Sequence, residues 1–182
     1  MRVIAGSAGG IPLRLPRHDL RPTMDKVKAA IFSSLGERIA GAKVLDLFAG
    51  SGGLGIEALS RGCAEAVFVD SHAQAIASIQ ANLEKTRLTG KVERADVFTW
   101  LKRNAGARHF DLIFADPPYA KNPGDLDFAR RLVESTDLRS ALEPTGLFIL
   151  ERAPQKPEWP DTGLFTIVRQ KQYGATDVLF LV

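Results

Sequence analysis

The feature that most constrains the fold is a glycine-rich loop between an expected strand and an expected helix. Residues 50–55 read Gly-Ser-Gly-Gly-Leu-Gly and match the pattern G-x-G-x-x-G. They follow a short apolar run over 43–48 and lead into an apolar helical segment over 54–61. In such a unit the glycines let the backbone approach a ligand at the start of the helix. The loop therefore predicts an α/β fold with a ligand site at the carboxyl end of its first strand.

Beyond Gly41, expected strands alternate with expected helices, which is typical of a parallel sheet covered on both faces. A closing antiparallel hairpin is expected about Tyr173-Gly174. The pattern predicts a Rossmann-like, doubly wound α/β sheet that is mostly parallel. The expected strands are Lys43–Phe48, Glu65–Asp70, Lys91–Ala95, Phe110–Ala115, Gly146–Glu151, Phe165–Arg169 and Thr176–Leu181, and the expected helices are Leu54–Arg61, a segment marked by Ile76, Ile79 and Leu83, Phe98–Arg103 and Phe128–Thr136.

The first 41 residues are expected to form an extension to this sheet. Val3–Ala5 and Leu13–Leu15 could pair as a small hairpin across a glycine-rich turn. Arg21-Pro22-Thr23 then leads into a helix, with Thr23 as its N-cap and Asp25 in its first turn. We therefore expect one domain over 1–182, divided into an extension (1–41) and a Rossmann-like core (42–182).

Composition narrows the classes of protein. The 182 residues are 45% hydrophobic, which fits one packed domain. No apolar run approaches the roughly 20 residues that span a bilayer, and the amino terminus has no signal-peptide pattern. The single cysteine, Cys63, and the three histidines share no metal-ligand spacing. We expect a cytoplasmic monomer without a bound metal or a membrane partner.

The positive charge is concentrated at the amino terminus. The net charge is only +3, but residues 1–43 carry eight Lys or Arg against three Asp or Glu. A basic amino-terminal region favours a polyanion partner, because phosphate contacts supply much of the affinity for nucleic acid. The alternative interpretation is that these charges form a solvated surface without a partner. The residues expected to contact RNA are Arg2, Arg14, Arg17, Arg21, Lys26 and Lys28.

Asp46 decides which cofactor the glycine loop would bind. The loop alone would also fit a nicotinamide dinucleotide, with Asp70 about twenty residues on. A carboxylate four residues before Gly50 opposes a pyrophosphate, which needs amide donors and the positive end of a helix dipole. It suits S-adenosylmethionine, which carries an ammonium and a sulfonium group and no phosphate. A dinucleotide remains the lesser alternative, and a loop cap is the structural alternative for Asp46.

Two further carboxylates end successive strands of the expected sheet. Asp70 is placed to accept hydrogen bonds from ribose hydroxyls, and Asp96 from the adenine amino group beside Val97. Asp96 could instead simply cap the following helix. The expected cofactor contacts are Asp46, Phe48, Ala49, Gly50, Ser51, Gly52, Asp70, Asp96 and Val97.

The sequence Asp116-Pro117-Pro118-Tyr119 follows the fourth expected strand and predicts the acceptor. Two prolines remove two amide donors, so the groups that face a ligand are acceptors. The Asp116 carboxylate and the Pro117 carbonyl could hold both hydrogens of an exocyclic amine on a base, and Tyr119 could stack on that base. The four residues are therefore expected to be catalytic, with a rigid turn as the alternative.

These motifs resemble the RsmD family of bacterial 16S ribosomal RNA guanine-N2 methyltransferases. The resemblance runs nearly end to end, through Arg21-Pro22-Thr23-x-Asp25-Lys26-Val27-Lys28, Asp46-x-Phe48-Ala49-Gly50-Ser51-Gly52 and Asp116-Pro117-Pro118-Tyr119. It implies the class I S-adenosylmethionine-dependent methyltransferase fold and a guanine in an assembled or assembling small ribosomal subunit as the acceptor. It also implies that the segment ending at Thr23 folds over the cofactor.

The chain departs from the family pattern in two places. The turn Gly6–Ile11 lacks the basic residues that relatives carry, which weakens the case for RNA contacts there. Asp70 stands where many relatives have glutamate, so its shorter side chain could transfer a ribose contact to Ser71. The alternatives to the family function are a DNA adenine-N6 methyltransferase and a non-catalytic RNA-binding assembly factor on the same scaffold.

Overall fold

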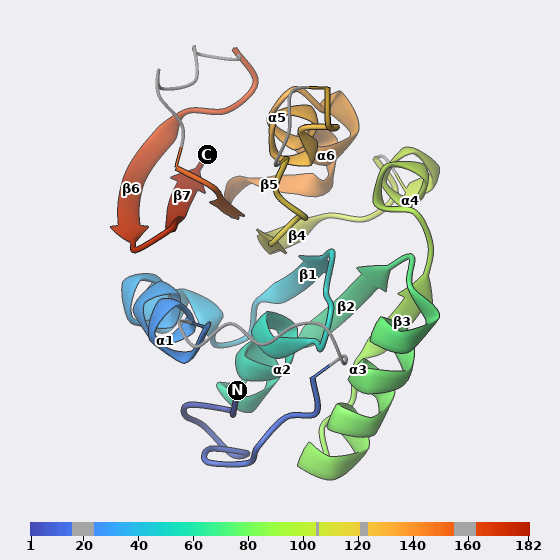
Figure 1. The fold of residues 1–182 in the computed structure, drawn as a ribbon, viewed down its shortest axis with the longest axis vertical. Coiled ribbons are helices and arrows are strands. Elements are labelled where there is room, and N and C mark those ends of the chain that lie inside the picture. The colour runs from blue at the N-terminus through green and yellow to red at the C-terminus, as the bar shows by residue number, and fades with distance from the viewer. Residues whose placement is uncertain (16–23, 105, 121–123, 155–162) are drawn as a thin grey trace.

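A computed structural model describes residues 1–15, 24–104, 106–120, 124–154 and 163–182. These residues form a seven-stranded sheet in the order β3-β2-β1-β4-β5-β7-β6 (Figure 1). The first five strands of this order, from β3 through β2, β1 and β4 to β5, pair in parallel, and β7 is antiparallel to both β5 and β6. The expected α/β sheet with an antiparallel end is confirmed. The strands are β1 (Lys43–Leu47), β2 (Glu65–Asp70), β3 (Lys91–Arg94), β4 (Phe110–Ala115), β5 (Leu142–Arg152), β6 (Ile167–Tyr173) and β7 (Thr176–Leu181).

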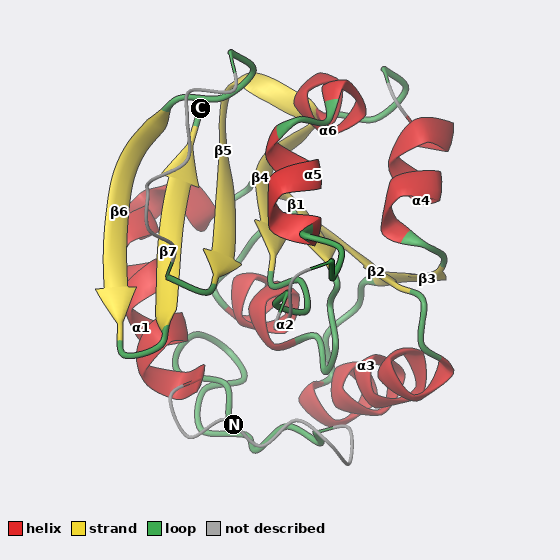
Figure 2. Cartoon of the chain, turned by 45° about the horizontal axis from the view of Figure 1, so that its top comes forward, coloured by secondary structure: helices red, strands yellow, loops and turns green. Residues whose placement is uncertain are grey.

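Helices cover both faces of the sheet (Figure 2). Successive residues of a strand point to opposite faces, so Val44 packs with one hydrophobic core and Leu45 with the other. The central strands β1, β2 and β4 are mostly apolar for this reason, whereas the edge strands β3 and β6 carry several charged or polar residues. One face carries α1 (Met24–Leu35), the 3₁₀ helix η1 (Gly36–Ile39), α2 (Gly53–Ser60) and α3 (Ala73–Thr86), and the other carries α4 (Val97–Asn104), α5 (Phe128–Val133) and α6 (Thr136–Ala141).

Several elements differ from their expected bounds; strand β5, expected over 146–151, runs from Leu142 to Arg152. The single helix expected over 128–136 is instead two helices, because the Ser135 hydroxyl accepts a hydrogen bond from the Leu138 N–H at 3.1 Å and starts α6 anew. The strand expected over 165–169 begins at Ile167 and continues to Tyr173. Phe165 lies before the strand, buried against Phe148 with ring centroids 5.5 Å apart.

The amino-terminal hairpin is smaller than expected and pairs in a different register. An isolated bridge joins Arg2 to Pro12, flanked by backbone hydrogen bonds from the Val3 N–H to the Ile11 carbonyl at 2.9 Å and from the Leu13 N–H to the Met1 carbonyl at 3.0 Å. The N–H groups of Ile4 and Ala5, which would have extended the pairing, donate instead to the Glu57 carboxylate at 2.6 and 3.1 Å. Helix α1 follows, with Asp25 in its first turn. Thr23 and the preceding Arg-Pro lie outside the described residues.

No helix within the described ranges is long and apolar enough to cross a membrane. Strands β1 and β4 are neighbours although β2 and β3 lie between them in the sequence, so the order of connection reverses there. In open α/β sheets ligands bind beside such a reversal, at the carboxyl ends of the strands.

Candidate functional site

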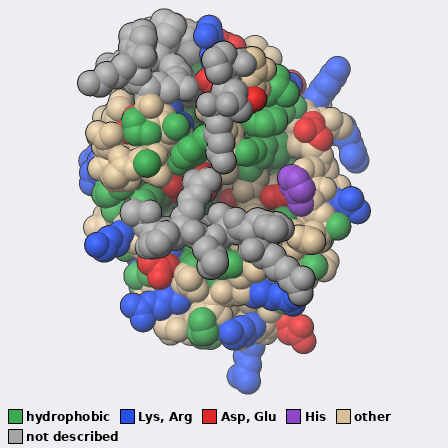
Figure 3. Space-filling model, in the orientation of Figure 1, with side chains coloured by type: hydrophobic (Ala, Val, Ile, Leu, Met, Phe, Trp, Pro, Cys, Tyr) green, Lys and Arg blue, Asp and Glu red, His purple; other side chains and the backbone are tan. Residues whose placement is uncertain are grey.

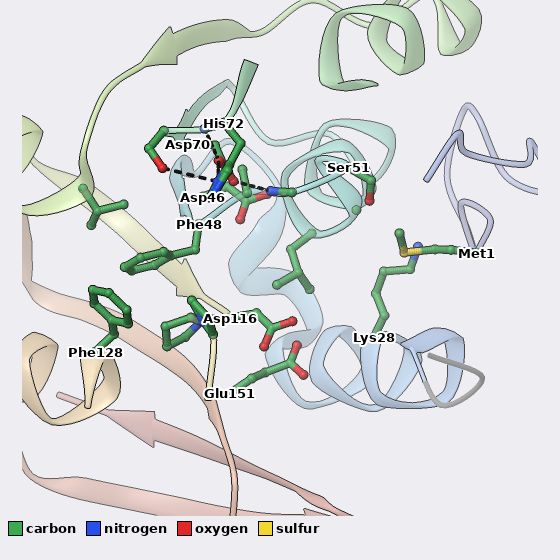
Figure 4. A pocket seen from close by; sticks show the side chains of 18 of the residues that line it. Met1, Lys28, Asp46, Phe48, Ser51, Asp70, His72, Asp116, Phe128 and Glu151 are labelled. Atoms are coloured by element: carbon green, nitrogen blue, oxygen red, sulfur yellow. Dashed lines mark hydrogen bonds and ion pairs between the residues drawn. The ribbon is translucent and has the colours of Figure 1, made fainter. Parts of the chain in front are cut away.

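A cavity of about 310 Å³ opens at the carboxyl ends of β1 and β4. Figure 3 shows acidic side chains in the hollow at the middle of this face, bordered by hydrophobic ones. Elements from both halves of the sheet meet at this point, and α1 and the amino terminus also reach it (Figure 4). The residues that line the cavity are Met1, Lys28, Asp46, Phe48, Ala49, Gly50, Ser51, Gly53, Leu54, Asp70, Ser71, His72, Asp96, Val97, Asp116, Pro117, Pro118, Phe128 and Glu151.

The glycine loop owes its shape to backbone conformations that favour glycine. Gly50 and Gly52 have φ angles of +55° and +78°. Gly55 is required for a different reason, because a Cβ there would lie 2.3 Å from the Phe68 ring. Gly52 closes the turn onto the Ala49 carbonyl at 2.7 Å and is not among the residues that line the cavity. The loop therefore exposes backbone at Gly50 and Ser51 to the cavity.

Asp46 is a buried acid of the site with a raised pKa. It is only 2% exposed, and its carboxylate accepts a hydrogen bond from the Gly55 N–H at 2.8 Å. The pKa of Asp46 is raised to about 8: burial is the largest cause and the Asp70 and Asp116 carboxylates add to it, while the Gly55 hydrogen bond acts in the opposite direction. A buried acid of this kind favours a cationic ligand, which would stabilise its charged form.

Asp70, at the end of β2, shapes the other side of the loop. Its two carboxylate oxygens accept hydrogen bonds from the Gly50 N–H at 2.9 Å and from the His72 N–H at 2.8 Å. The His72 ring lies 3.1 Å from the same carboxylate. Ser71 is exposed beside them. A carboxylate has about four acceptor positions, so Asp70 keeps the capacity to bind a further donor.

Asp96 caps helix α4. One of its oxygens accepts from both the N–H and the hydroxyl of Thr99, each at 2.9 Å. This oxygen of Asp96 therefore has the role of a helix cap, which was the alternative considered for this residue. Asp96 and the buried Val97 also line the cavity. An Asp at this position can serve both purposes, because its second oxygen makes none of the contacts with Thr99.

Phe48 and Phe128 lie on one wall of the cavity; Phe48 was expected among the cofactor contacts, whereas Phe128 was missed. Phe48 has a backbone φ of +54°, which is unusual for a residue other than glycine. The centroid of its ring lies 5.6 Å from that of Phe128. Phe98 stacks on Phe128 at 6.2 Å, and the Arg131 guanidinium lies 3.8 Å from the Phe98 ring centroid. Phe128 follows the helix cap Asp127, so its sequence context pointed only to the start of a helix.

Asp116 and the two prolines enter the cavity directly after β4. Tyr119 is not among the residues that line it, and its expected stacking on the base stays a prediction. Its hydroxyl lies 3.2 Å from the Thr176 hydroxyl, which holds the side chain toward β7. Glu151, near the end of β5, lines the cavity beside Asp116 and was missed because a lone charged residue after an apolar strand carries no motif.

Lys28 is buried, so the prediction that it contacts RNA from the protein surface is wrong. Its side chain is 3% exposed, with the ammonium 2.5 Å from the Arg2 carbonyl and 3.4 Å from the Glu57 carboxylate. Burial lowers the pKa of Lys28, against the opposing charges of Glu57 and Asp25. Glu57 is fully buried and also binds Arg61 at 2.7 Å, so it joins α1 and the amino terminus to α2.

The other expected RNA contacts divide into two groups. Arg2, Arg14 and Lys26 are exposed. Arg17 and Arg21 lie outside the described residues. Across the described ranges, no group of three or more His, Cys, Asp or Glu is arranged to hold a metal ion. Cys63 is a buried thiol.

Comparison with known proteins gives matches along the whole chain. The family model "Conserved hypothetical protein 95" matches residues 1–182. The Bacillus subtilis protein YlbH is 41% identical over 186 residues, covering 98% of this chain and 96% of that protein. Ribosomal RNA small subunit methyltransferase D of Haemophilus influenzae is 33% identical over 180 residues, covering 96% and 89%.

Among solved structures, the 16S rRNA N2 G1207 methyltransferase RsmC of T. thermophilus, in complex with AdoMet and guanosine, is similar with a TM-score of 0.72 and 27% identity. The match covers 90% of this chain and 43% of that one. This chain has the class I methyltransferase fold, in agreement with its sheet order and with the cavity at the β1–β4 reversal. The chain therefore belongs to the RsmD family of S-adenosylmethionine-dependent ribosomal RNA methyltransferases.

Proposed function

We propose that this protein methylates the exocyclic N2 amino group of one guanine in 16S ribosomal RNA, acting as a monomer on the assembled or assembling small subunit. The observation that carries the proposal is the position of Asp116: it opens onto the same cavity as Asp46 and the glycine loop. An acceptor for an amine therefore lies beside a site suited to a cationic methyl donor.

The residues present fit S-adenosylmethionine. Asp46 is buried with a pKa of about 8, and a cation beside it would favour the charged carboxylate. Gly50 and Ser51 bring backbone to the cavity for the amino-acid end of the ligand, and Asp70 retains acceptor capacity for ribose hydroxyls. Asp96 and Val97, with Phe48 and Phe128, form an apolar wall with one carboxylate, as an adenine ring needs.

The proposed role of Asp116 is to hold and orient the amine. An exocyclic amine is a poor nucleophile because its lone pair is delocalised into the ring. The Asp116 carboxylate and the Pro117 carbonyl would each accept one of its hydrogens, which directs the lone pair toward the methyl donor. Alignment of this kind is worth roughly 7–11 kcal/mol in favourable cases. When bound, S-adenosylmethionine supplies a methyl group activated by its positively charged sulfur.

The charge changes require no covalent enzyme intermediate. As the nitrogen–carbon bond forms and the carbon–sulfur bond breaks, the sulfur keeps the electron pair and the nitrogen becomes positive. That nitrogen then loses a proton, for which Asp116 is the nearest candidate acceptor on the protein and water is the alternative. The exposed Arg2, Arg14 and Lys26 are proposed to contact RNA phosphates on the amino-terminal side.

The decisive experiment compares ribosomal RNA from cells that lack the gene with RNA from cells that carry it. Mass spectrometry of 16S RNA digests should show one N2-methylguanine missing, and the purified protein with labelled S-adenosylmethionine should restore it on undermodified small subunits. Label transferred to duplex DNA and not to these subunits would defeat the proposal, and so would an unchanged set of methylated nucleosides.

A further inference from the structure

Glu151 places a second carboxylate next to Asp116 in the cavity. In the pairing of β4 with β5, Ala115 lies opposite Leu150, so Asp116 and Glu151 are the next residues along two adjacent strands. Neighbouring strands lie about 4.8 Å apart. Figure 4 shows both carboxylates directed to the same part of the cavity. The two acids therefore present acceptor oxygens side by side.

The alternation of the sheet explains why the two side chains share a face. Phe114 and Ile149 belong to the core under α1, whereas Ala115 and Leu150 belong to the opposite core. One residue further on, Asp116 and Glu151 return to the α1 face. Both strands thus deliver a carboxylate to the same side of the sheet, and both residues line the cavity.

Two neighbouring carboxylates call for two neighbouring donors on the ligand, because an ionised carboxylate only accepts hydrogen bonds. Guanine meets this demand, since its N2 amino group is flanked by the ring N1–H. Adenine and cytosine also carry an amino group, but the adjoining ring nitrogen bears a lone pair instead of a hydrogen. Facing a carboxylate, that ring nitrogen could donate no hydrogen bond, and its lone pair would be repelled by the negative charge.

We propose that Glu151 selects guanine by accepting the N1–H while Asp116 accepts a hydrogen of the neighbouring N2 amino group. The inference rests on the proposed function and deepens it, since the sequence motif at Asp116 serves any exocyclic amine. Glu151 is a specificity residue and acts on the base, not on the methyl donor. Sites built to hydrogen-bond a donor can reject an analogue that lacks it by roughly 10⁴–10⁵.

The test uses RNA that carries either guanine or 2-aminopurine at the methylated position. 2-Aminopurine keeps the N2 amino group, but its N1 is an acceptor. For the wild-type protein, kcat/KM should be at least about 100-fold higher on guanine. Glu151→Gln should lose about 5- to 10-fold on guanine, because the amide carbonyl can still accept the N1–H but without the negative charge that strengthens this hydrogen bond. On 2-aminopurine it should equal or exceed the wild type, because the amide N–H can donate to N1.

The matched control is Glu143→Gln, which makes the same chemical change on β5 at residue 143, outside the lining of the cavity. It should leave both rates unchanged. Glu151→Asp retains the carboxylate and should keep the preference for guanine, which separates a charge effect from a folding defect. An equal loss on both bases for Glu151→Gln, or no loss on guanine, overturns the inference. A wild-type protein that forms no N2-methylguanine at all would instead overturn the proposed function.

Discussion

The Asp46 carboxylate accepts a hydrogen bond from the Gly55 N–H at 2.8 Å, which ties the end of β1 to the first turn of α2 around the glycine loop. The same carboxylate is buried, and its pKa is raised to about 8. One acid thus organises the loop and remains protonated near neutral pH until a cation reaches the cavity.

This relationship predicts pH-dependent cofactor binding. A cationic ligand favours ionised Asp46, so binding should release a proton below about pH 8, and the affinity for S-adenosylmethionine should rise by up to about tenfold per pH unit toward that value. Calorimetry in buffers of different ionisation enthalpy measures the proton release directly. An affinity that is constant between pH 6 and 8 would contradict the assignment.

The same acid predicts an unusual pH dependence of stability without ligand. The folded-state pKa of about 8 lies above the ordinary value of 3.8, so the folded protein binds this proton more tightly than the unfolded chain. The stabilisation is complete below about pH 4 and is lost as the pH rises through about 8. Asp46→Asn retains an acceptor for Gly55 and removes the titration. Denaturant unfolding of this variant should show a flatter decline between pH 5 and 8 than the wild type.

Asp116→Ala should abolish methylation while leaving the affinity for S-adenosylmethionine within a few-fold. The reason is that Asp116 is proposed to hold the amine, whereas Asp46 and the glycine loop are proposed to hold the donor. Single-turnover methylation of undermodified small subunits and calorimetry with the cofactor measure the two effects separately. Retained turnover would rule out the mechanism assigned to Asp116.

Phe128→Ala should weaken cofactor binding by roughly tenfold, in line with the 0.5–1.5 kcal/mol that aromatic pairs contribute beyond their burial. Phe128 contacts both Phe48 and Phe98, so its removal opens the apolar wall of the cavity. Phe128→Leu restores most of the apolar volume and should recover part of the affinity. Equal affinities for the Ala variant and the wild type would show that the adenine ring does not use this wall.

Glu57→Ala should lower the free energy of unfolding by about 3–5 kcal/mol, because it leaves the buried Lys28 ammonium without its carboxylate partner. It also removes the acceptor for the Ile4 and Ala5 N–H groups. Denaturant unfolding gives the first effect. Hydrogen exchange should show faster exchange at those two amides, and a loss of stability without this local change would argue against the connecting role of Glu57.

Arg14→Gln and Lys26→Gln should weaken binding to small-subunit RNA without altering cofactor affinity. Each exposed charge that contacts a phosphate should contribute about one unit or slightly less to the slope of log affinity against log salt. Filter binding over a range of salt concentrations measures this slope. The comparison variant is Lys102→Gln, on α4 at the other face of the sheet, for which an unchanged slope is expected.

Much of this protein could be predicted from residues close together in the chain. The central strands β2 and β4 are nearly continuous apolar runs because both faces of the sheet are covered there, and their bounds match the prediction residue for residue. The glycine loop and Asp116 were recognisable because turns and rigid dipeptides are local features. Conversely, the break at Ser135 was missed because one hydroxyl, not a change in periodicity, starts the second helix.

The tertiary structure decided what depends on contacts between distant residues. Lys28 and Glu57 are 29 positions apart in the sequence, and only their pairing in the core turned an expected surface lysine into a buried one. Tyr119 belongs to a recognisable motif, but the contact of its hydroxyl with Thr176 on β7, 57 positions away in the sequence, is formed only in the folded structure. Glu151 carries no motif at all, and the register of β4 with β5 alone places it beside Asp116. Local sequence determined the strands and the loop because backbone conformation is a local property, whereas burial, charge pairing and the shape of the cavity are properties of surfaces that meet only on folding.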